Sequence, residues 1–107
     1  MSIAAIIIEP KDSRFYVPVS TEVFFERCWL PGVKELKLEL TSYFYSPGID
    51  LNKKHFPKLI NELSLLKEWA KIMLTENDCS HLIGRVDRLV EEMNVAFKDE
   101  GVIIYIG

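Results

Sequence analysis

The sequence predicts an α+β fold, in which a small, mostly antiparallel sheet of three to five strands packs against three helices. Two observations carry this prediction. Residues 56–74 and 82–97 repeat apolar side chains at steps of three and four, the spacing of one helix face. Residues 3–8 and 102–106 are short apolar runs rich in β-branched side chains, as in strands. The two helical stretches are neighbours in sequence, so we expect a long antiparallel helix pair.

Length and composition indicate one globular unit. The chain has 107 residues, of which 49% are hydrophobic and 27% charged. We therefore expect residues 1–107 to form a single domain. The apolar run at 3–8 is too short for the hydrophobic part of a signal peptide, and no run is long enough to span a bilayer. A cytoplasmic protein that does not enter a membrane is the expectation.

The predicted strands differ in where they lie in the sheet. Residues 3–8 and 102–106 have no polar side, so we expect both strands to be buried on both faces. The second of these is expected to be central in the sheet. Pro18 lacks a backbone donor, so the extended residues 15–19 fit an edge strand.

The first predicted helix follows this edge strand. Either Ser20 or Thr21 can cap it by accepting a bond from a free amide of the first turn. Pro31 and Gly32 predict that the helix ends or kinks there. A further helical turn over residues 33–35 is also compatible with the sequence.

From residue 36 apolar and polar side chains alternate, which predicts a half-exposed strand over residues 36–45. A short extended segment is expected over residues 49–51. On this prediction the core side of the first strand carries Leu36, Leu38, Leu40 and Phe44. The outward side carries Lys37, Glu39, Thr41, Tyr43 and Tyr45.

The central helix is expected from residue 56 to about residue 74, with Asn52 as its cap. One apolar stripe comprises Phe56, Leu59, Ile60, Leu63, Leu66, Ala70 and Met73, and a second comprises Leu65, Trp69 and Ile72. Two adjacent stripes predict a wide buried face. The next helix is expected to bury Leu82, Val86, Leu89, Val90, Met93, Ala96 and Phe97 and to expose Asp87, Arg88, Glu91, Glu92 and Asn94.

Charge is unevenly distributed along the chain. The net charge is −3, but residues 53–75 carry five basic and two acidic side chains. Residues 76–107 carry three basic and seven acidic side chains. A charged partner should therefore prefer one side of the molecule. The acidic total argues against nucleic acid as that partner.

No arrangement of residues predicts catalysis, a metal or a cofactor. Cys79 and His81 flank Ser80, but a zinc site needs about four ligands and a cysteine nucleophile needs a positioned base. We therefore expect no enzyme activity, no metal and no cofactor. A bridge between Cys28 and Cys79 stays open, although two buried free thiols are the favoured prediction.

Three fragments carry a resemblance to a known group of proteins. They are VPVSTEVFFERCWLPGVKEL at 17–36, HFPKLINELSLLKEWA at 55–70 and the final VIIYIG at 102–107. With their intervening elements they resemble small bacterial immunity proteins of polymorphic and contact-dependent growth-inhibition toxin systems. The resemblance implies a cytoplasmic protein that binds and blocks one cognate toxin domain, often a nuclease. It supplies no functional residues.

The partner-binding residues are predicted from charge and exposure. Acidic side chains on the last helix can steer a basic partner, and outward tyrosines beside charges suit a protein interface unless a helix covers them. The predicted set is Asp87, Glu91, Glu92 and Asp99, with Glu39, Tyr43 and Tyr45 in addition. The alternatives are a small enzyme or ligand-binding domain, or a regulatory subunit of a larger assembly. A toxin gene beside this one would distinguish them.

Overall fold

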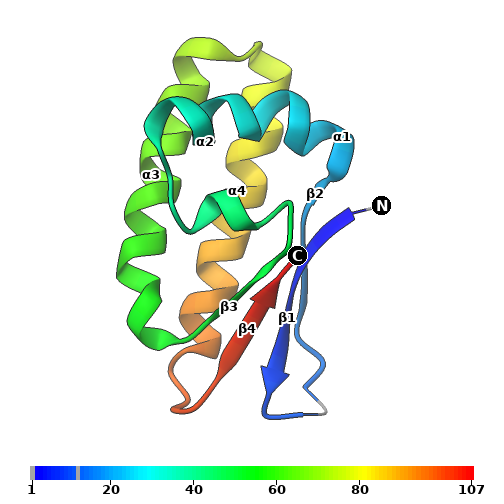
Figure 1. Cartoon of the computed structure of the whole chain (residues 1–107), viewed down its shortest axis with the longest axis vertical. Coiled ribbons are helices and arrows are strands. Elements are labelled where there is room, and N and C mark those ends of the chain that lie inside the picture. Colours follow the sequence, from blue (N-terminus) through cyan, green and yellow to red (C-terminus); the bar gives the residue numbers. More distant parts are fainter. Residues whose placement is uncertain (1, 12) are drawn as a thin grey trace.

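The computed structural model describes residues 2–11 and 13–107, and its four strands and several helices are drawn in Figure 1. The strands are β1 (Ser2–Glu9), β2 (Tyr16–Thr21), β3 (Ile49–Leu51) and β4 (Ile103–Ile106). The helical elements are α1 (Glu22–Phe24), the π-helical η1 (Phe25–Trp29), α2 (Leu30–Leu36), the 3-10 helices η2 (Thr41–Tyr43) and η3 (Lys53–His55), and the long helices α3 (Phe56–Met73) and α4 (Glu76–Ala96). The predicted α+β fold with a long helix pair is confirmed.

The sheet is antiparallel throughout and has the strand order β2-β1-β4-β3. β4 is central, as its wholly apolar sequence predicts. β2 is an edge strand, as Pro18 predicts, and the register with β1 shifts between Ile3 and Ala4, beside the position of the proline. A proline is tolerated at such an irregular edge because it has no amide to donate to the ladder.

The prediction that residues 3–8 and 102–106 are buried on both faces is wrong. Ala5 and Ile104 on the inner face are fully buried, whereas Ile6 on the outer face is 37% exposed. The helices all lie on one side of the sheet (Figure 1), so only one set of alternating side chains enters the core.

Part of the outer sheet face is covered by the turn that precedes β3. Gly48 in this turn has a φ of +93°, and a Cβ there would collide with the ring of Tyr105 on β4. The Tyr105 hydroxyl donates a hydrogen bond to the carbonyl of Pro47 at 3.2 Å. Glycine is needed here for both its backbone conformation and its lack of a side chain.

α1, η1 and α2 follow one another without a break, so the predicted end at Pro31 is wrong and the further turn over 33–35 is present. Of the two predicted caps, Thr21 caps the first turn. Its hydroxyl oxygen accepts a hydrogen bond from a backbone amide at 3.1 Å. Pro31 is the second residue of α2, directly after the π-helical segment. The backbone hydrogen bonds change there from the π-helical to the α-helical pattern. The missing N–H group of the proline is therefore not needed for a helical hydrogen bond.

Gly32 allows close helix packing instead of ending the helix. A Cβ at this position would come within 2.7 Å of the Trp69 ring and 2.8 Å of Leu66 on α3. The helix ends at Lys37, whose φ of 55° is left-handed. The helix therefore ends five residues after Gly32, where the sequence predicts an end or a kink.

The prediction of a strand over residues 36–45 is also wrong, and the buried carboxylate of Glu62 on α3 explains why. Glu62 Oε2 accepts the Leu40 amide at 3.0 Å. Glu62 Oε1 accepts the amide and the hydroxyl of Thr41 at 2.9 and 2.8 Å. These bonds satisfy the amides at the start of η2, which a neighbouring strand would otherwise bind.

The alternation of burial in this segment survives without a strand. The side chains of Leu38, Leu40 and Phe44 are buried, while Glu39, Tyr43 and Tyr45 are exposed. Thr41, expected to point outward, is fully buried because it binds Glu62. Residues 49–51 form the extended β3, as predicted.

Polar residues cap the two long helical stretches, and Asn52 lies at the predicted position. Asn52 and His55 cap η3, which continues directly into α3. α3 ends at Met73. Thr75 caps α4, because its hydroxyl oxygen accepts a hydrogen bond from a backbone amide at 3.3 Å. The short polar connection makes the two helices neighbours in space, as predicted.

The buried face of α3 is narrower than its sequence predicts. Ile60, Leu65, Ile72 and Met73 are 37%, 45%, 82% and 58% exposed. α3 packs mainly against α4 and α2, so the side away from them stays in solvent. The α4 prediction is confirmed: Leu82, Val86, Leu89, Met93 and Phe97 are buried, Val90 and Ala96 are half-buried, and Asp87, Arg88, Glu91, Glu92 and Asn94 are exposed.

Candidate functional site

The seven predicted partner-binding residues fall into two groups with different surroundings. Asp87, Glu91 and Glu92 lie on α4, and Asp99 lies in the turn that follows it. Glu39, Tyr43 and Tyr45 lie on the segment that the sequence assigns to a strand and that the structure forms as turns and η2. No hydrogen bond or ion pair between described residues joins the two groups.

The second group is largely engaged within the molecule. Glu39 accepts a bond from Lys58 Nζ at 2.6 Å, and this bond holds the pKa of the Glu39 carboxyl below its usual range. The Tyr45 hydroxyl donates to Glu26, which raises the pKa of Tyr45. Its ring stacks on Phe25 at 5.9 Å between centroids. Tyr45 is thus partly covered by η1, whereas Tyr43 is 45% exposed and its side chain forms no hydrogen bond among the described residues.

The first group differs in how its carboxylates are neutralised. Asp87 accepts a bond from Lys67 Nζ on α3 at 2.7 Å, so it is not the free acid that the sequence suggests. Glu91 and Glu92 are exposed, and within residues 2–11 and 13–107 neither of them forms an ion pair. Glu91 and Glu92 are therefore unpaired carboxylates on the exposed side of α4, and the exposed Arg88 lies one helical turn before them.

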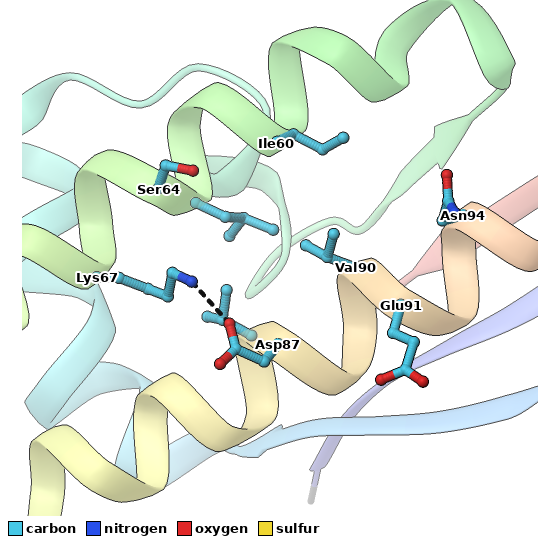
Figure 2. A pocket seen from close by; sticks show the side chains of 9 residues that line it. Ile60, Ser64, Lys67, Asp87, Val90, Glu91 and Asn94 are labelled. Carbon is cyan, nitrogen blue, oxygen red and sulfur yellow. Dashed lines mark hydrogen bonds and ion pairs between the residues drawn. The ribbon is translucent and has the colours of Figure 1, made fainter.

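A groove of about 340 Å³ runs between the two long helices beside this acidic side. We call it the α3–α4 groove. It is lined from α3 by Ile60, Leu63, Ser64 and Lys67 and from α4 by Val86, Asp87, Val90, Glu91 and Asn94. Figure 2 shows the Lys67 and Asp87 side chains pointing toward each other across the groove, with Val90 pointing from α4 toward α3.

The groove has an apolar centre and polar edges. Leu63 and Val86 are buried and form its floor, and Ile60 and Val90 remain partly open to solvent. Because the Lys67 charge is paired with Asp87, Glu91 carries the unpaired charge of the lining.

Sequence reasoning missed this groove because it placed Ile60 inside the buried stripe. A signal was present in the sequence. Ser64 and Asn94 follow Ile60 and Val90 by one helical turn each, so a polar residue interrupts each apolar line at that edge. Such interruptions mark where a helix face meets solvent.

The groove contains one pair that could suggest chemistry. Ser64 and Lys67 are one helical turn apart, and a serine beside a lysine can serve as a nucleophile with its base. Here Lys67 donates to Asp87 instead, and in the described part of the chain no hydrogen bond joins Ser64 to a base. The arrangement favours an ion pair between helices over a catalytic pair.

The cysteine and histidine side chains that the sequence singles out have structural surroundings. Cys28 is buried and free, and burial raises the pKa of its thiol. Cys79 is free and half-buried, which corrects the prediction that both thiols are buried. His81 packs edge-on against Phe24 at 4.7 Å, and His55 Nδ1 accepts the Asn52 amide at 3.0 Å.

Neither the described residues nor three comparisons with known proteins point to a metal, a membrane span or a family. Within residues 2–11 and 13–107, no group of three or more His, Cys, Asp or Glu side chains is arranged to hold a metal ion. Over the same ranges, no helix combines the length and the apolar character needed to cross a bilayer. Comparisons with protein-family models, curated proteins and solved structures found no match.

Proposed function

We propose that this chain acts by stoichiometric binding to another protein, as an immunity protein that neutralises a cognate bacterial toxin domain. The observation that carries the proposal is a pair of carboxylates, Glu91 and Glu92, which form no ion pair among the described residues and lie on the exposed side of α4 beside an open apolar groove. Exposed charge beside an apolar surface is the usual make-up of a protein interface with a polar rim.

The charge distribution supports a basic partner. Toxin domains that act on nucleic acid need a basic surface to hold their substrate, and an acidic protein can cover it. The attraction would speed the encounter at low salt and weaken as salt is added. Solvated carboxylates contribute little to folding stability, so they can be changed without unfolding the protein.

The test is calorimetric binding to the product of the adjacent toxin-like gene, with Glu91→Lys and Glu92→Lys combined in one variant. We expect one-to-one binding by the wild-type protein. The double variant should keep its thermal stability, bind about tenfold or more weakly, and lose most of the salt dependence.

A matched control combines Glu9→Lys with Glu35→Lys, which changes the net charge equally at two exposed positions outside α4. This control should bind almost as tightly as the wild-type protein. Equal affinity and equal salt dependence of both double variants would reject the acidic side of α4 as the interface. A folded wild-type protein that does not bind the neighbouring product would count against the immunity function.

A further inference from the structure

We propose that the α3–α4 groove receives an aliphatic side chain of the protein partner, and that an arginine or lysine next to that side chain pairs with Glu91. The inference rests on the proposed function, and it adds the location of the contact and the chemistry of the partner segment. It also shifts the centre of the interface from the outermost acids of α4 to the boundary between the two long helices.

The shape and lining of the groove favour an apolar occupant. Its volume of about 340 Å³ lies at the lower end of the range for ligand-sized pockets, so it suits a small insertion. Leu63 and Val86 are buried at its floor, and Ile60 exposes 37% of its surface at the wall. An inserted aliphatic side chain would bury the wall and keep the floor free of water.

The charge at the rim of the groove favours a basic residue next to the inserted side chain of the partner. Lys67 and Asp87 neutralise each other at 2.7 Å and close one part of the rim. Glu91 lines the groove and forms no ion pair among the described residues, while Arg88, one turn earlier on α4, is not part of the lining. The charge of the groove is therefore complementary to a basic residue, and an acidic segment would be repelled.

Polar groups at the groove edges can hold the backbone of the partner segment. The Ser64 hydroxyl lines the α3 side, and the Asn94 amide lines the α4 side. Both side chains are exposed, and no hydrogen bond within the described residues occupies either of them. Serine and asparagine can each donate and accept, so they suit an exposed peptide group.

Two groove variants test the inference without touching the core. Ile60→Glu places a charge in the apolar wall, and Ser64→Phe fills the groove from its exposed edge. Their matched controls on the same helix are Leu65→Glu, at a position 45% exposed, and Asn61→Phe, at an exposed position. Neither control position lines the groove. Circular dichroism melts establish that all four variants are folded.

Binding to the adjacent gene product is measured first. Each groove variant should weaken binding about tenfold or more, and each control should remain within about threefold of the wild-type protein. Wild-type affinity in both groove variants would overturn the groove as the contact and leave the proposed function standing.

A peptide titration decides the inference even if that product does not bind. The probe is acetyl-Arg-Leu-Leu-Arg-amide, followed by the backbone amide signals of Ile60, Ser64, Val90 and Asn94 in heteronuclear NMR spectra. These signals should shift saturably, and the shifts should disappear in Ser64→Phe. The comparison peptides acetyl-Glu-Leu-Leu-Glu-amide and acetyl-Arg-Ser-Ser-Arg-amide should shift them much less. Equal shifts with all three peptides, or no shifts, would overturn the inference.

Discussion

At the scale of single residues, Glu62 determines the path of the chain after the first helix. Its side chain is only 5% exposed, and its two oxygens accept three hydrogen bonds from Leu40 and Thr41. A buried carboxylate is costly unless its oxygens are bonded, and backbone amides are equally costly when they lack an acceptor. Each side of this contact therefore depends on the other.

Replacing this carboxylate should destabilise the protein strongly. Glu62→Ala leaves two amides and one hydroxyl without an acceptor in the interior, so we expect the free energy of unfolding to fall by about 3 kcal/mol. Urea denaturation measures this loss. The control is Glu68→Ala on the same helix, where the solvent-exposed pair with Lys71 should contribute far less to stability. Similar losses in the two variants would contradict the role given to Glu62.

The sequence holds a partial signal for this residue. Glu62 follows Leu59 by three positions and precedes Leu66 by four, so it lies on the apolar stripe of α3. That placement alone predicts a buried acid. The groups that it binds are more than twenty positions away in the sequence, and local periodicity contains no information about them.

At the scale of elements, an ion pair joins the first helical stretch to the start of α4. Arg27 on η1 contacts Asp78 in the first turn of α4 at 2.6 Å, and its guanidinium lies 5.5 Å from the centre of the Phe24 ring. The hydrogen bond from Arg27 lowers the pKa of the Asp78 carboxyl. The two paired residues are fifty-one positions apart in the sequence, so this contact links two distant elements.

This ion pair predicts a pH dependence of stability. A carboxyl whose pKa is lower in the folded protein than in the unfolded chain stabilises the fold. This stabilisation is fully present at pH values above the unfolded pKa of about 3.9. The contribution is lost as the pH falls through the folded pKa. Asp78→Asn should therefore be less stable than the wild-type protein near about pH 7, and the difference should shrink toward about pH 2.

Urea denaturation of both proteins across this pH range measures the difference. Arg27→Gln serves as the matched variant, because it removes the same pair from the other side. A constant gap between Asp78→Asn and the wild-type protein at all pH values would contradict the predicted contribution of the ion pair.

Elements with local end signals could be predicted, and elements fixed by distant contacts could not. Asn52 and Thr75 mark the starts of the long helices because a cap acts on the amides two or three residues away. Residues 36–45 alternate between apolar and polar side chains because this segment lies on the core. A segment in that position buries and exposes its side chains in turn, whether or not it pairs as a strand. Gly32 was misread because the residue that needs its small size, Trp69, lies on another helix.

At the scale of the whole molecule, the sheet order joins segments from the two ends of the described chain. β1 pairs with β4 as well as with β2, and Ala5 lies opposite Ile106. Both residues are fully buried. The most protected backbone should therefore lie where these two strands meet, since exchange there requires global opening.

Native-state hydrogen exchange tests this expectation. Amides in β1 and β4 that bond each other should exchange slowest, with an opening free energy close to that of global unfolding. Amides of the 37–48 segment that do not bind Glu62 should exchange faster. Exchange in β4 as fast as in this segment would contradict the central position of β4 in the stability of the fold.

The candidate site was predictable only in part at this scale. The segregation of acidic charge to residues 76–107 is visible in the sequence, and Glu91 and Glu92 are exposed as expected. The pairing of Asp87 with Lys67 depends on how far α4 is displaced along α3. That displacement is set by how the buried faces of the two helices pack, which no charge pattern reveals.

The central pairing of β1 with β4 also has a consequence for the synthesis of the protein. β1 leaves the ribosome before α3, α4 and β4, so the strand that covers its second edge is complete only when residue 106 has emerged. Until then the nascent chain presents an apolar strand with one row of unpaired amides and carbonyls. Such an edge can pair with another chain. We therefore expect this edge of β1 to need shielding, by a chaperone or by rapid translation of α4 and β4, until its partner strand has emerged.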